Sequence, residues 1–227
     1  VNGVFLLRPP AISDVERTLI PFIDAARRRD VSHIVFLSVA GAAKNRLVPH
    51  HKVERHLMEG RDTSWTLLRP GFFAQNFGDA YRRDISADDR IYVPAGKGRV
   101  AFVDVRDLAD VIATIFESPS LHREAAYTLT GAEAVDFATA ARQLSAELGR
   151  PIRYEAASLL GYSVHLVRRG LPLAQVAVQL VLHAGLRFGQ AARVDPTLER
   201  LLHRRPRGLE QYFVDHRALW GSTKTST

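Results

Sequence analysis

The stretch His33-Ile34-Val35-Phe36-Leu37-Ser38 decides the fold class. Its short, continuous apolar run is typical of a strand that is buried on both faces, as in a parallel sheet. Val4-Phe5-Leu6-Leu7, which ends at Pro9-Pro10, is a second run of this kind. Ser64-Trp65-Thr66-Leu67-Leu68, which ends at Arg69-Pro70-Gly71, is predicted to be a third strand. These segments therefore predict three strands, of which the two continuous apolar runs are expected to be buried.

Helical patterns separate these strands. Ser13 followed by Glu16 has the spacing of a capping box, which predicts a helix from there to about Arg29. A second helix is predicted from about Pro49 to Met58. Strands that alternate with helices across short loops are typical of parallel βαβ units with right-handed crossovers. The fold class is therefore α/β.

The middle of the chain predicts more irregular structure. A helix is expected from Phe72 to about Arg83, and two apolar runs flank Gly96-Lys97-Gly98, a turn signal that predicts a β-hairpin. Asp107 is expected to cap a helix that extends to Phe116. The other expected elements are strands at 126–129 and 152–154 and a helix at 137–148 that Gly149 ends.

From Ser158 onward the chain is predicted to be mainly helical. Leu171 to Leu186 is its most membrane-like stretch, but it is too short to span a bilayer. Gln175, Gln179 and His183 recur along one helical face within it. We therefore expect an amphipathic helix that packs on the core rather than on lipid.

Composition restricts the class of protein. Apolar residues make up 46% of the 227 residues and charged residues 24%, the balance of a soluble globular protein. The absence of cysteine excludes disulfides and thiolate metal sites and favours a reducing, cytoplasmic setting. The net charge of +7 comes mainly from arginines in short, scattered clusters, without a nucleic-acid-binding motif. We predict no specific nucleic-acid partner and no membrane partner.

Six blocks of sequence, in order, resemble the NmrA-like group of atypical short-chain dehydrogenases/reductases. They lie at 4–10, 33–41, 50–54, 68–76, 102–109 and 127–131. The resemblance extends to Trp220 and implies a Rossmann-like parallel sheet whose N-terminal strands are missing, with a smaller, mostly helical C-terminal cap on the substrate side. It implies a cofactor-binding part at 1–150, the cap at 151–220 and a disordered tail at 221–227.

One element of that family is not found among these residues. In the family, the first strand leads into a glycine-rich loop that holds the cofactor's pyrophosphate. Gly96-Lys97-Gly98 follows a strand but opens no helix, so it does not match that loop. The missing part would be roughly 60–70 residues at about 30 per βαβ unit. We expect the residues from Val1 onward to belong to a longer polypeptide, because Val4–Leu7 would otherwise form an open apolar edge.

The resemblance implies that NADP or NAD is the cofactor and that the carboxyl ends of the strands hold it. Arg8 and Pro9 would run beside its ribose and adenine side, unless they only form a rigid strand exit. Ser38 would face the nicotinamide and donate to a carbonyl oxygen of the substrate, unless its hydroxyl only bonds to loop backbone. After the third strand, aromatic residues that could equally be core side chains are implied in cofactor contact, together with their neighbours: Pro70, Gly71, Phe72, Phe73 and Asn76.

His50 is the preferred acid/base candidate. The Tyr-x-x-x-Lys pair of the conventional dehydrogenases is absent from this helix, and relatives in the group place Lys or His at the matching position. An imidazole that titrates near 6.5 is able to donate a proton at neutral pH. Glu54 lies one helical turn on, where it is expected to orient His50 and favour its charged form. Alternatively, His51 points inward, or His50 and Glu54 form a surface pair.

Two classes of function remain open. The first is an NAD(P)H-dependent oxidoreductase that reduces a small carbonyl, quinone or related acceptor, as a monomer or homodimer. The second is a non-catalytic, NAD(P)-sensing regulator, and a solvent-facing His50 would favour it. A metal site made of His50, His51, Glu54 and His56 is disfavoured, because no third ligand is obviously placed.

Overall fold

The computed structural model describes residues 1–9, 12–60 and 63–221 and divides into two compact units. Unit 1 contains 1–71, 106–130 and 195–205, and unit 2 contains 72–105, 131–194 and 206–227. The units are interleaved along the sequence. The division predicted near residue 150 concerns cofactor and substrate roles, and it stays a prediction. The predicted disordered tail lies, after Gly221, outside the described residues.

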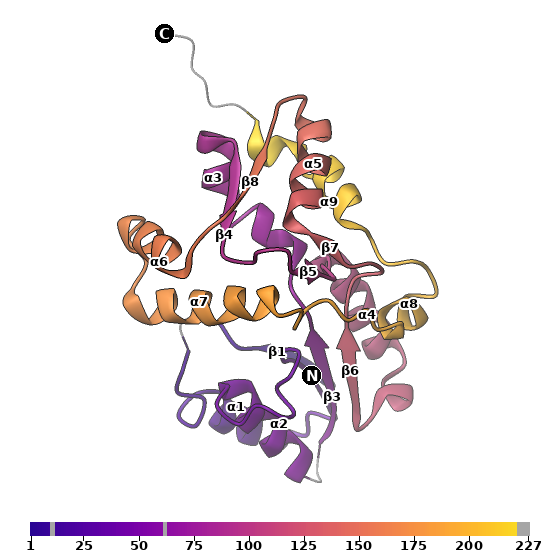
Figure 1. Cartoon of the computed structure of the whole chain (residues 1–227). Helices are drawn as coiled ribbons and strands as arrows, with labels where there is room; N and C mark the ends of the chain where they lie inside the picture. Colours follow the sequence, from indigo (N-terminus) through magenta and orange to yellow (C-terminus); the bar gives the residue numbers. More distant parts are fainter. Residues whose placement is uncertain (10–11, 61–62, 222–227) are drawn as a thin grey trace. The chain divides into compact units, whose positions relative to one another are not determined.

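Unit 1 contains a parallel sheet in the order β1-β2-β3-β6. Its strands are β1 (Gly3–Leu7), β2 (His33–Leu37), β3 (Ser64–Pro70) and β6 (Ala125–Leu129). All three strand pairs are parallel, and Figure 1 shows β3 and β6 with the same direction. Four parallel strands at the predicted positions, among which β2 and the middle of β3 are buried, confirm the α/β class. β1 is at the end of this order and exposes Phe5 and Leu7, as predicted for an apolar edge.

The helices of unit 1 are connected to this sheet. They are α1 (Leu19–Arg27), α2 (Pro49–Glu59), α4 (Val105–Glu117), the short η2 (Pro119–His122) and α8 (Thr197–Leu202). Val15, Ile23 and Val53 pack with apolar residues of β2 and β3 in one buried cluster. The apolar periodicity of α1 and α2 is therefore explained by this core.

Two predictions about helix starts are wrong. α1 begins at Leu19 rather than at the Ser13–Glu16 box, and the Glu16 carboxylate accepts from Lys52 Nζ at 2.7 Å. Asp107 does not cap α4, since the helix already begins at Val105. Asp107 is instead buried in the first turn, where its Oδ1 accepts from Arg204 Nη2 at 2.7 Å.

Unit 2 is a helical unit with two short sheets. Its elements are η1 (Ala74–Phe77), α3 (Arg82–Asp88), β4 (Arg90–Val93), β5 (Arg99–Val100), β7 (Val135–Asp136), α5 (Phe137–Leu148), β8 (Arg153–Ala156), α6 (Leu159–Arg168), α7 (Leu173–Arg187), α9 (Leu209–Asp215) and η3 (Arg217–Trp220). Aromatic rings dominate its core: Phe77 is in edge-to-face contact with Tyr81, Phe102 and Phe213.

Two further predictions fail in unit 2. The Gly96–Gly98 turn does not close a hairpin, because β4 pairs in parallel with β8 and β5 pairs antiparallel with β7. The continuous helix expected from Phe72 is interrupted, since Phe73 forms an isolated bridge with Val103 and only η1 and α3 are helical. In both cases, backbone hydrogen bonds to segments distant in the sequence replace the local structure that was predicted.

The prediction for helix α7 is correct for only one of its two sides. It is amphipathic, and Val176, His183 and Leu186 are buried on one side. Its other side is not core: Leu173, Val178 and Val181 are exposed. Within the described residues, every helix is too short or too polar to cross a membrane.

Candidate functional site

The carboxyl ends of β1, β2 and β3 bring several predicted residues to one edge of the sheet in unit 1. Arg8 follows β1, Ser38 follows β2, and Pro70 is the last residue of β3. Backbone hydrogen bonds continue the pairing past the strands, from Ser38 N to Leu68 O at 2.7 Å and from Ala40 N to Pro70 O at 2.9 Å. This edge is where open α/β sheets bind ligands.

His50 points into the protein at this edge. It follows Pro49, the first residue of α2, and only 8% of it is exposed. Its ring centroid lies 6.1 Å from that of Phe36 in β2. His51, the alternative candidate, is half-buried, and its Nδ1 lies 2.8 Å from the carbonyl oxygen of Ala42. The inward-facing imidazole is therefore that of His50.

Arg8 is the partner of His50 that the sequence did not predict. Its Nε donates to His50 Nε2 at 3.3 Å, and its Nη1 also donates to the carbonyl oxygens of Pro9 and Ile12. A neutral imidazole that accepts at Nε2 carries its proton on Nδ1. Among the described residues, that Nδ1 has no hydrogen-bond partner.

The surroundings of His50 oppose its charged form. Burial, followed by the positive charge of Arg8, lowers the pKa of His50 to about 4, although the Glu54 carboxylate acts in the opposite direction. Burial also lowers the pKa of the Arg8 guanidinium. His50 is therefore neutral at pH 7 in this structure, in contrast to the charged form that the His50–Glu54 spacing predicts.

The Glu54 carboxylate is held by two other residues. It is fully buried, and Arg69 donates to it twice, from Nε to Oε1 at 2.9 Å and from Nη2 to Oε2 at 2.7 Å. The Ser38 hydroxyl donates to Oε1 at 2.5 Å. Glu54 thus acts on His50 through its charge, and Ser38 would have to release Glu54 before it could donate to a substrate. Arg69 was not predicted as the partner of Glu54. The only indication in the sequence is that a charged residue in a buried strand needs a partner of opposite charge.

The predicted aromatic residues belong to unit 2. Phe72 packs edge-to-face on Phe102 and His183, at ring-centroid distances of 6.1 and 5.7 Å. Phe73 is held in extended backbone beside Val103. The carbonyl oxygen of Asn76 accepts from Tyr81 N at 2.9 Å. These contacts fit the core alternative for Phe72, and cofactor contact by Phe72, Phe73 and Asn76 stays a prediction.

A metal site is not supported. His56 Nε2 lies 2.7 Å from Asp24 Oδ1, and Glu54 is bound by Arg69. Across 1–9, 12–60 and 63–221, no three histidine or acidic side chains gather as a metal site requires. The four residues considered for a metal are therefore not brought together.

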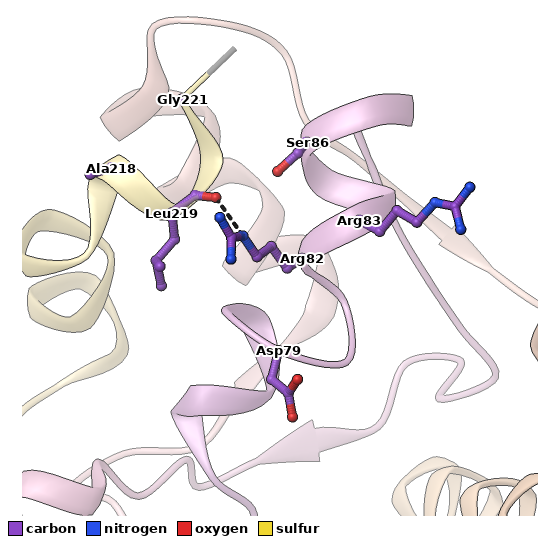
Figure 2. A pocket seen from close by; sticks show the side chains of 7 residues that line it. All are labelled: Asp79, Arg82, Arg83, Ser86, Ala218, Leu219 and Gly221. Carbon is purple, nitrogen blue, oxygen red and sulfur yellow. Dashed lines mark hydrogen bonds between the residues drawn. The ribbon is translucent and has the colours of Figure 1, made fainter. Parts of the chain in front are cut away.

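Two pockets among the described residues are lined by side chains other than the predicted site residues. In unit 2, a pocket of about 410 Å³ lies between α3 and the C-terminal turn, lined by Asp79, Arg82, Arg83, Ser86, Ala218, Leu219 and Gly221. Figure 2 shows Arg82 reaching the carbonyl oxygen of Leu219, to which its Nε donates at 2.9 Å. In unit 1, a pocket of about 230 Å³ lies beside the start of α2, lined by 13–16, 47–49 and Lys52.

The side chains at the sheet edge fit an anionic, hydrogen-bonding ligand such as a dinucleotide. Arg69 neutralises Glu54, so the guanidinium of Arg8 gives this edge a positive charge. The neutral His50 also offers its Nδ1–H as a donor. The glycine-rich phosphate loop of the resembled family is not among residues 1–227.

Comparison with solved structures agrees with this fold. The NADPH complex of an NADPH-dependent quinone oxidoreductase from Escherichia coli gives a TM-score of 0.84 at 22% identity, over 96% of this chain and 77% of that one. NmrA, a negative transcriptional regulator, in complex with NADP gives 0.72 at 14% identity, over 95% of this chain and 74% of that one. At these identities the similarity establishes the fold alone.

Sequence comparison decides the family. No family model matches the chain. An NAD(P)H azoreductase from Xenophilus azovorans is 30% identical over 228 residues, which cover 98% of this chain and 78% of that protein. The chain belongs to the NmrA-like group of atypical short-chain dehydrogenases/reductases. An uncharacterized oxidoreductase, YesF, from Bacillus subtilis is 29% identical over 98% of this chain and 77% of its own length.

Proposed function

We propose that this member of the NmrA-like group is part of an NAD(P)H-dependent oxidoreductase that reduces a small carbonyl, quinone or related acceptor. The observation that carries the proposal is the buried imidazole of His50, paired with the half-buried Arg8 at the carboxyl edge of the sheet. The names of the relatives support the same reaction class: an NAD(P)H azoreductase by sequence and a quinone oxidoreductase by fold. A small-molecule acceptor and a cytoplasmic setting stay part of the proposal.

The residues of unit 1 would hold the cofactor at the strand ends. Arg8 and Pro9 would flank its ribose and adenine side, and Pro70 and Gly71 would let the backbone approach the nicotinamide. When bound, NAD(P)H supplies the hydride. The preference of the protein for NADP or NAD is set by residues near the ribose 2′ position, which are not among those assigned above.

His50 stabilises the negative charge that develops on the acceptor oxygen. Its neutral imidazole donates from Nδ1, while Arg8 fixes the tautomer and adds a positive charge beside the ring. As charge grows on the acceptor oxygen, it favours the protonated form of His50 and so opposes the lowering of its pKa. His50 would take up a proton from solvent and pass it to the oxygen, which completes the reduction and returns the imidazole to its neutral form.

The Ser38–Glu54–Arg69 cluster positions this pair. It joins the end of β2, helix α2 and the end of β3 through three side-chain hydrogen bonds. Because Glu54 lies one turn after His50, these bonds fix the rotation of α2 and therefore the direction of the imidazole. We assign Glu54 and Arg69 as positioning residues.

The burial of His50 favours the enzyme over the non-catalytic sensor, for which a solvent-facing imidazole was expected. The test uses the full-length polypeptide, NADPH titrated by fluorescence, and reduction of a quinone, an azo dye and a triphenylmethane dye. We expect NADPH to bind, and His50→Ala to lower kcat by about 100-fold or more while binding persists. His51→Ala, the matched control, should retain activity.

Two outcomes would contradict separate parts of this proposal. If NADPH does not bind to the folded protein, the cofactor assignment is wrong. If NADPH binds but His50→Ala reduces every acceptor as fast as the wild type does, His50 is not the proton donor.

A further inference from the structure

Helices α6 and α7 of unit 2 present an apolar surface that no part of the proposed reaction uses. The two helices pack side by side (Figure 1), and their inner residues Tyr162, Leu166 and Val176 are buried in the unit's core. Nine large apolar side chains on their outer side are exposed: Leu159, Leu160, Val164, Val167, Leu173, Val178, Val181, Leu182 and Phe188. We call these nine residues the hairpin face.

The exposed residues form stripes rather than scattered positions. On α6, Leu160, Val164 and Val167 are spaced i, i+4, i+7, and on α7 Leu173 and Val181 lie eight residues apart on one side. Leu160, Leu173, Val181 and Phe188 are each 73–79% exposed. Exposed apolar side chains that gather on two adjacent helices indicate an interaction site rather than the usual scatter of single apolar residues.

The charged residues within the segment that carries the hairpin face have one sign. Residues 156–194 contain four arginines and no Asp or Glu. Arg169 is bound to Asp84 of α3, with Nη2 2.7 Å from Oδ1. Arg168 and Arg187 are exposed. The nearest acidic residues along the chain are Glu155, which pairs with Arg90, and Asp195.

We propose that the hairpin face docks on the surface of an anionic lipid bilayer, lying in the interface without spanning it. Exposed leucine, valine and phenylalanine beside arginines are the side chains of helices that bind in this way. Long arginine side chains are able to cover apolar surface while their guanidinium groups reach lipid phosphates. The proposal replaces our expectation of no membrane partner, which assumed that this face packs on the core.

Charge disfavours a second copy of the chain as the occupant. In a two-fold dimer the same patch meets itself, so arginines of one copy would face arginines of the other without an acidic counterpart in this segment. The surface of an anionic bilayer instead supplies negative charge over its whole area. The proposal does not depend on the reductase activity.

The test is flotation of the full-length protein with phosphatidylcholine vesicles that contain or lack phosphatidylglycerol. We expect binding to the anionic vesicles only, and its loss in high salt. The double substitution Leu173→Glu/Val181→Glu and the double substitution Arg168→Gln/Arg187→Gln should each weaken binding by about tenfold or more. Leu121→Glu changes a side chain of η2 that is 77% exposed, and it is the matched control that should bind like the wild type.

Three results would overturn the proposal. They are the absence of vesicle binding, equal binding to neutral vesicles, and binding that survives Leu173→Glu/Val181→Glu in a protein with unchanged circular dichroism. Sedimentation velocity tests whether a second copy of the chain, rather than a bilayer, covers the hairpin face. A stable dimer that Leu173→Glu/Val181→Glu dissociates would assign the face to a second copy. The NADPH titration of the proposed function is independent of all these results.

Discussion

The Nε atom of Arg8 lies 3.3 Å from the Nε2 atom of His50, so a positive charge is held against the imidazole proposed as the proton donor. This charge is one of the two causes that lower the pKa of His50 to about 4, the other being burial. The pair therefore links the exit of β1 to the first turn of α2 both geometrically and electrostatically.

Removing the Arg8 charge should raise the pKa of His50. In Arg8→Gln the repulsion disappears while burial and the Glu54 carboxylate remain, so we expect a rise of about one unit or more. Titration of the imidazole resonances by NMR measures this value. Arg17→Gln, an exposed arginine outside the pair, should leave it unchanged. A His50 pKa that is the same in Arg8→Gln and the wild type would contradict the assigned cause.

Acidification should destabilise unit 2 through His183. Burial lowers the pKa of His183 to about 4, and Tyr81 Oη lies 2.6 Å from its Nε2. The unfolded chain binds this proton near pH 6.5 and the folded chain only near pH 4. Between these values the unfolded state holds more protons, so the free energy of unfolding falls as pH falls, by on the order of 1 to 2 kcal/mol from pH 7 to 5.

Urea denaturation at the two pH values measures this loss. His183→Gln should remove much of the pH dependence, although it lowers stability at pH 7 by breaking the Tyr81 contact. His203→Asn is the control, because His203 is exposed and Asn tolerates its left-handed backbone. A pH dependence that persists unchanged in His183→Gln would assign it to other groups, such as His50.

The sequence predicted those helices and strands that depend on residues close together in the chain, such as caps, terminating glycines and apolar runs. The helix expected at 137–148 is α5, which Asp136 caps by accepting from Thr139 N at 2.7 Å and which Gly149 ends at a φ of 65°. The continuous apolar runs predicted β1 and β2 of the parallel sheet in the same way. Both signals depend on near neighbours, so no knowledge of the tertiary structure was needed.

Long-range pairing was not predictable in this way. The Gly96–Gly98 turn resembles a hairpin locally, but the partner of β4 is β8, about sixty residues later in the chain. In the site, the positions of His50 and Glu54 on one helix were expected, whereas their partners Arg8 and Arg69 come from two different strand ends. A spacing of four residues indicates that two side chains are near each other, but not which third group binds them.

Breaking the buried pair of Glu54 and Arg69 should be costly. Glu54→Gln leaves the Arg69 guanidinium, 17% exposed, without its charge partner, and we expect a loss of roughly 3 kcal/mol in the free energy of unfolding. Urea denaturation followed by circular dichroism measures it. Glu59→Gln breaks the exposed Arg55–Glu59 pair on the same helix and should change stability by less than about 0.5 kcal/mol. Equal losses in the two variants would refute a special role for the buried pair.

Gly98 should be intolerant of any side chain, for a reason that its turn-like sequence conceals. A Cβ atom at this position would lie 2.0 Å from the carbonyl oxygen of Leu186, so the backbone of α7 passes directly over it. Gly98→Ala must displace backbone rather than a flexible side chain, and we expect it to cost roughly 2 kcal/mol or more. The control is Gly208→Ala, whose Cβ would meet only Glu133 Oε1 at 3.9 Å. Thermal denaturation of both variants measures the difference, and a Gly98→Ala protein as stable as Gly208→Ala would show that α7 does not approach this turn.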